Sequence, residues 1–94
     1  MKTIPNKAVT FADKPGLFSD MLKAALDFPP ERGFDPSTIR ARARLDVVLK
    51  DAKEGGELIF EDADYETAKT AIAACRWATR STDHVALFDA FGIS

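Results

Sequence analysis

Apolar residues with a period of two mark two short segments of this chain, residues 7–11 and 57–61. The first places Val9 and Phe11 on one face, and the second places Leu58 and Phe60 on one face and Ile59 on the other, which predicts a pair of strands. The residues in front of the first strand, 1–6, are largely polar and include Pro5. We expect them to form a flexible N-terminal tail.

Longer segments carry apolar residues three and four positions apart, the spacing of a helix that faces a core. The expected helices are 17–28, 36–54, 63–79 and a shorter one capped by Ser81 or Thr82. The second has the clearest start, because Asp35 can cap its free N–H groups and Pro36 suits the first helical position. We expect Leu45, Leu49 and Ile72 to be almost fully buried, since they centre the main apolar stripes.

The order of these elements is β-α-α-β-α-α, which predicts an α+β fold. With 94 residues, of which 46% are hydrophobic, the chain is long enough for one compact domain. We expect an α-rich globular domain over residues 7–94, in which a small two-stranded ribbon packs on about four helices.

The helix expected at 36–54 has a second apolar ridge opposite its main face. The ridge consists of Ile39, Ala43 and Val47, with Arg40 and Arg44 beside it. A helix with two apolar sides either packs between neighbours inside its own domain or leaves one side for a partner. We therefore predict these five residues as partner-binding.

The arginines of that segment, Arg40, Arg42 and Arg44, have two possible counter-charges. One is the run of carboxylates near the start of the next helix, in the same chain or in a second copy; its members are Glu61, Asp62, Asp64 and Glu66. The other is a phosphate backbone, which would make the protein a small nucleic-acid-associated regulator. The net charge of −2 gives no general attraction to nucleic acid.

No catalytic, metal-binding or cofactor-binding motif is visible. Cys75 and His84 are the only cysteine and histidine, and the chain lacks a Gly-rich phosphate loop and zinc spacing. The acidic run at Asp62 does not continue as a calcium loop. We expect no enzyme activity, metal or cofactor, and expect Trp77 to fill the corner before the last helix.

The N-terminal residues lack the apolar stretch of a signal peptide, and no segment has the length of a membrane span. We therefore expect a cytoplasmic protein. Two stretches, 24–42 with its Asp27-Phe28-Pro29-Pro30 run, and 58–77 ending at Trp77, resemble small uncharacterised proteins of tailed bacteriophages and prophages. This resemblance implies a bacterial host cytoplasm and a role in particle assembly or in modulating a host or phage protein.

Together these observations predict a non-enzymatic protein-interaction module, acting by self-association or by docking on a larger partner. The alternative is the nucleic-acid-associated regulator, with the arginine-rich helix 36–54 as its contact. Salt-dependent DNA binding would favour the regulator, and salt-insensitive dimerisation would favour the interaction module.

Overall fold

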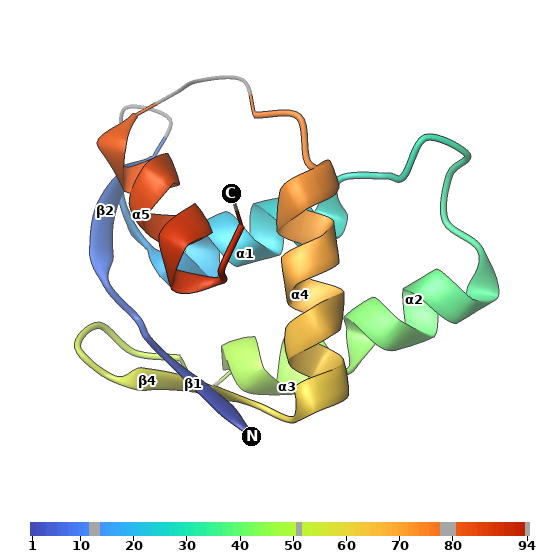
Figure 1. Cartoon of the computed structure of the whole chain (residues 1–94), viewed down its shortest axis with the longest axis horizontal. Coiled ribbons are helices and arrows are strands. Elements are labelled where there is room, and N and C mark those ends of the chain that lie inside the picture. The colour runs from blue at the N-terminus through green and yellow to red at the C-terminus, as the bar shows by residue number, and fades with distance from the viewer. Residues whose placement is uncertain (12–13, 51, 78–80, 94) are drawn as a thin grey trace.

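The chain folds into helices that pack beside two small antiparallel sheets (Figure 1). The computed structural model describes residues 1–11, 14–50, 52–77 and 81–93. The elements in chain order are β1 (Lys2–Pro5), β2 (Ala8–Phe11), β3 (Lys14–Leu17), α1 (Phe18–Asp27), α2 (Pro36–Ala43), α3 (Leu45–Lys50), β4 (Glu57–Phe60), α4 (Asp62–Ala74) and α5 (Thr82–Ala90). The predicted α+β class is confirmed.

The segment expected to be a tail, 1–6, contains strand β1 instead. β1 pairs antiparallel with β4, and Ile4 lies opposite Leu58 in the register. Both side chains are buried, whereas Ile59 on the other face of the ribbon is exposed. The expectation of a tail was wrong because the strand that pairs with β1 is distant in the sequence. Only pairing with β4 buries the Ile4 side chain and gives the backbone of this segment its hydrogen-bonding partners.

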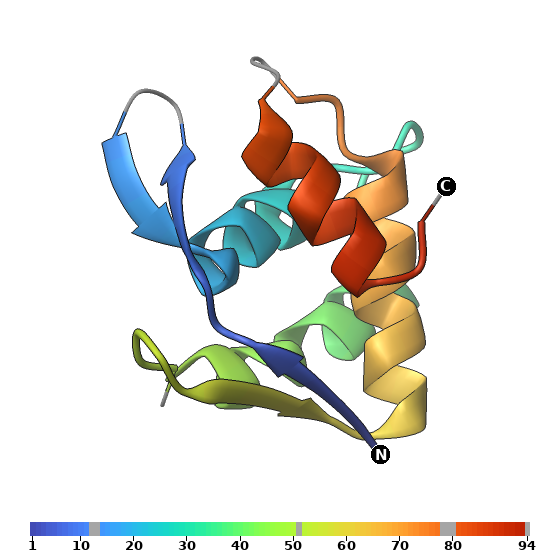
Figure 2. The same ribbon diagram turned by 60° about the vertical axis from the view of Figure 1, so that its left-hand side comes forward.

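Strand β2 lies within the expected segment 7–11 but does not pair with the strand near residue 60. It forms a hairpin with β3, in which Ala8 lies opposite Leu17. Residue 17 was expected to begin a helix but ends β3 instead, and the predicted single ribbon is replaced by two separate ribbons. The hairpin leads directly into α1, and the two ribbons lie apart on one side of the helices (Figure 2).

The core lies between α1, α4, α5 and the β1–β4 ribbon. The predicted stripe of α1 is buried throughout, at Phe18, Met21, Leu22 and Ala25. Three aromatic rings close the core beside the ribbon: Tyr65 stacks on Phe91 at 5.5 Å between ring centroids, and Phe60 meets Phe91 edge-on at 5.8 Å. The α4 residues Ala68 and Ile72 are also buried, as the helical spacing predicted.

The expected helix 36–54 forms two shorter helices, α2 and α3, which meet at Arg44. Its predicted start is confirmed, because the Asp35 carboxylate accepts a hydrogen bond from the Thr38 backbone N–H at 2.7 Å. This bond lowers the pKa of Asp35 below its usual value. Leu45 is fully buried as predicted, but Leu49 is only half-buried, so the expectation for Leu49 was wrong.

Helix α4 ends at Ala74 and not near residue 79. Residues 78–80, at the expected end of this helix, lie outside the described residues. The helix stops early because the chain turns to bring Trp77 against α5, where its ring meets His84 edge-on at 5.0 Å. This contact confirms the expected corner role of Trp77. At the other end, neither Asp62 nor Asp64 caps α4, whose N-cap is Glu61 without a side-chain cap bond.

Candidate functional site: the exposed face of helices α2 and α3

Helix α2 lies on the surface and has no buried residue. Its ridge residue Ile39 is 52% exposed, and Val47 of α3 is 71% exposed. Ala43, Arg40 and Arg44 are also exposed. We call these five residues the α2–α3 face. The ridge is therefore not enclosed within the domain, which removes the alternative of a helix packed on both sides; the partner-binding role of these residues stays a prediction.

A groove runs beside this face, between α2 and the end of α1. It has a volume of about 210 Å³ and is lined by Leu26, Asp27, Phe34, Ile39, Arg42, Ala43 and Asp46. The sequence reasoning missed Phe34, which is 41% exposed. Phe34 immediately precedes the N-cap Asp35, and Ile39 is the fourth residue of the helix, so their spacing is that of a hydrophobic staple. That spacing could have identified Phe34 as part of the surface.

Arg42 closes the groove and at the same time caps α1. Its Nη1 atom donates to the carbonyl oxygens of Leu26 at 3.0 Å and Phe28 at 2.8 Å, with a longer contact to that of Ala25. Its guanidinium also lies over the Phe34 ring, 5.4 Å from the centroid. A cation at the C-terminus of a helix is favoured by the helix dipole, and α1 has no basic residue of its own in its last turn.

Arg44 pairs with Asp64 at the start of α4, with Nε 3.3 Å from Oδ1. The sequence left open whether such carboxylates come from the same chain or a second copy, and for Arg44 the partner is in the same chain. Asp62 meets the N-terminal ammonium of Met1 at 2.7 Å, which lowers the pKa of its carboxyl. Arg40 makes no ion pair with any residue that the structure describes.

Replacing Arg42 with alanine is expected to lower the free energy of unfolding by about 1–2 kcal/mol, because the carbonyls at the end of α1 lose a charged donor. Chemical denaturation followed by circular dichroism measures this change. Arg40→Ala is the matched control, since it removes an exposed arginine from the same helix and should change stability by under about 0.5 kcal/mol. Equal losses in the two variants would contradict the capping role of Arg42.

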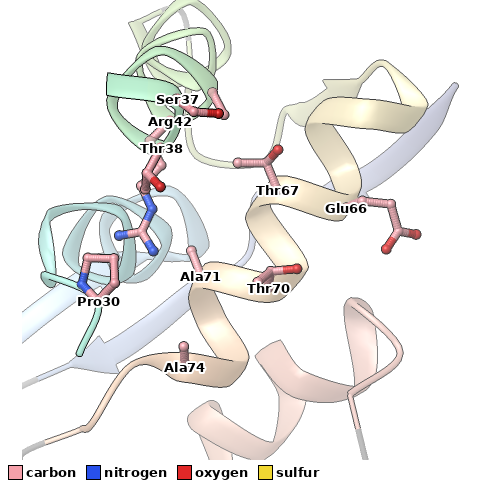
Figure 3. Close-up of a pocket in the computed structure, with 10 residues that line it drawn as sticks. Pro30, Ser37, Thr38, Arg42, Glu66, Thr67, Thr70, Ala71 and Ala74 are labelled. Carbon is pink, nitrogen blue, oxygen red and sulfur yellow. The ribbon is translucent and has the colours of Figure 1, made fainter. Parts of the chain in front are cut away.

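A second and larger cleft lies on the other side of α2, against α4 (Figure 3). Its volume is about 460 Å³. Hydroxyl groups and small apolar side chains line it, together with two charged residues: Pro30, Ser37, Thr38, Ala41, Arg42, Glu66, Thr67, Thr70, Ala71 and Ala74. We call it the α2–α4 cleft. No pattern in the sequence pointed to it, because its walls come from two helices about thirty residues apart.

His84 and Cys75, the only histidine and cysteine of the sequence, lie in different surroundings. His84 is buried and its Nδ1 lies 2.8 Å from the Ser81 hydroxyl, so it belongs to the cap of α5. Cys75 is half-buried, and burial raises the pKa of its thiol while the positive charge of Arg42 opposes that rise. Within the described ranges, no group of three or more His, Cys, Asp or Glu side chains is placed to hold a metal ion.

In the described part of the chain, no helix is both long enough and apolar enough to cross a membrane. The chain matches no family model, no curated protein and no solved structure.

Proposed function

We propose that this protein is a protein-interaction module that binds a partner, or a second copy of itself, through the α2–α3 face. The observation that carries the proposal is that α2 has no buried residue, although it presents Ile39 and Ala43 beside an open groove. Exposed apolar side chains gathered on one surface are typical of interfaces, whereas isolated ones are ordinary. The sequence resemblance to small phage and prophage proteins supports an accessory or assembly role.

The arrangement of the arginines supports a protein partner over nucleic acid. Arg42 is bound to the carbonyls of α1 and Arg44 to Asp64, so two of the three arginines already have partners within the chain. Nucleic-acid binding depends on several cations that neutralise phosphates together, and of the three arginines only Arg40 is without an ion pair or carbonyl contact among the described residues. The α2–α3 face is accordingly an apolar surface with a charged edge.

The test is the substitution Val47→Glu, which places a charge at the most exposed apolar position of the face. We expect it to weaken self-association or partner binding by about tenfold or more, because a desolvated, unpaired carboxylate would lie in the interface. The fold should be unchanged, since Val47 is 71% exposed. Sedimentation velocity over a range of concentrations, beside circular dichroism, measures both effects.

Val85→Glu is the matched control, because Val85 is also β-branched and 55% exposed but belongs to α5. Equal weakening by both variants would show a general charge effect and not a specific face. If Val47→Glu unfolds the protein, the ridge is part of the core and the proposal fails. A double variant, Ile39→Glu with Val47→Glu, that leaves all association intact would also overturn it.

A further inference from the structure

The α2–α4 cleft has the properties of a ligand site and not of a packing defect. Its volume of about 460 Å³ falls in the range of small-molecule pockets, which usually combine an apolar floor with a few convergent polar groups. The small side chains of Ala41, Ala71 and Ala74 leave the space between the two helices open to solvent.

Both walls of the cleft are held in place. The C-terminal end of the α2 wall is fixed by Arg42, which binds the carbonyls of Leu26 and Phe28, and by the ion pair of the adjoining Arg44 with Asp64. The α4 wall packs on the core, where Ala71 is buried. A cleft whose walls are anchored independently is largely formed before a ligand arrives, which lowers the entropic cost of binding.

Arg42 supplies the group of the cleft that can bind an anion. Among the described residues that line the cleft, Arg42 is the only cation and Glu66 the only anion. The guanidinium of Arg42 lies over the Phe34 ring, and only its Nη1 atom is used in the contacts with α1. Figure 3 shows Arg42 along the inner wall with Thr38 and Pro30, while the Glu66 carboxylate points away from it. The remaining guanidinium N–H groups can donate to an oxyanion, and the planar fork of arginine suits both carboxylate and phosphate.

The hydroxyl groups extend this polar side of the cleft. Thr67 donates its hydroxyl hydrogen to the Ala63 carbonyl at 3.1 Å, so its oxygen remains an acceptor. Ser37 and Thr70 add two further hydroxyls that can donate or accept. We propose that the α2–α4 cleft binds a small organic anion, with its apolar body on the alanines and its carboxylate or phosphate group on Arg42. This site lies on the opposite side of α2 from Ile39 and does not depend on the interaction proposed above.

Titration of the full chain with benzoate, phenyl phosphate and benzyl alcohol, followed by amide NMR shifts, tests the proposal. We expect benzoate or phenyl phosphate to shift the amides of Thr38, Thr67 and Ala71 with a Kd of about 1 mM, as befits so small a probe. The tighter of the two identifies the preferred oxyanion. Benzyl alcohol, which has the same ring without a charge, should bind at least about tenfold more weakly.

Two variant pairs locate the site. Ala74→Leu should fill the cleft and reduce anion binding about tenfold or more, whereas Ala73→Leu, next to it on α4 but outside the cleft, should not. Arg42→Gln should also reduce anion binding about tenfold or more, whereas its control, Arg40→Gln, should not. Three results would each overturn the proposal: benzyl alcohol binding as tightly as the anions, amide shifts outside the cleft, or anion binding unchanged in Ala74→Leu. None of these three results depends on Arg42→Gln being stable.

Discussion

Replacing Leu45 with alanine is expected to lower the free energy of unfolding by about 2–5 kcal/mol. Leu45 begins α3 and is completely buried in the core. The loss combines the transfer energy of the deleted methyl groups with the cavity that remains. A domain of this size has a total stability of only about 5–15 kcal/mol, so the variant should lose a large share of it. Urea denaturation followed by circular dichroism measures the change.

Leu49→Ala is the matched comparison, because it makes the same chemical change one turn later in the same helix. Leu49 is only half-buried, so less apolar area leaves the core and the expected loss is about 1–2 kcal/mol. A loss for Leu49→Ala that equals or exceeds the loss for Leu45→Ala would show that α3 is rotated relative to the structure described here.

The second large effect is expected for Asn6→Ala, which should cost about 2–3 kcal/mol. The Asn6 side chain is buried and accepts a hydrogen bond from the Ser19 backbone N–H at 3.0 Å, while its Nδ2 donates to the Lys53 carbonyl at 3.1 Å. It thereby joins the start of α1 to the loop before β4. Removing it leaves the Ser19 N–H without this acceptor, and an unsatisfied buried donor is costly, whereas the Lys53 carbonyl still accepts from the Gly56 N–H at 3.0 Å.

The measurement for Asn6→Ala is again urea denaturation, with Thr3→Ala as the control. Thr3 lies in β1 and is exposed, so its truncation should change stability by under about 0.5 kcal/mol. If both variants unfold at the same urea concentration as the unmodified protein, Asn6 does not hold these segments together.

The candidate face shows what the pattern of a single helix can and cannot predict about a binding surface. The spacing of Ile39, Ala43 and Val47 was visible in the sequence, because a period of 3.6 residues defines the faces of a helix whatever surrounds it. Whether those faces are covered depends on neighbours that the period does not specify. The groove with Phe34 and the α2–α4 cleft could not be foreseen in the same way, since each is formed where side chains from separate segments fail to fill a space.

The partners of the arginines were decided only by the tertiary structure. In the sequence, Asp46 is one helical turn from Arg42, but the folded chain places the Arg42 guanidinium at the end of α1. For Arg44, the sequence left several carboxylates open, and the fold selects Asp64. Long, flexible cationic side chains reach whatever acceptors the packing brings close, so local spacing does not determine their contacts.

By itself, the sequence determined the α+β class, the start of α2 at Asp35 and Pro36, the buried stripe of α1 and the start of α5 at Ser81 or Thr82, of which the structure selects Ser81 as the cap. These features depend on residues within one or two turns of each other, where periodicity and capping chemistry act directly. Only the tertiary structure decided that β1 pairs with β4, that Asn6 is buried and that α2 lies exposed between two clefts. Each of these features depends on contacts between segments that are distant in the sequence. The free energy of those contacts exceeds the weak preference of a short strand or a polar residue for a particular local structure.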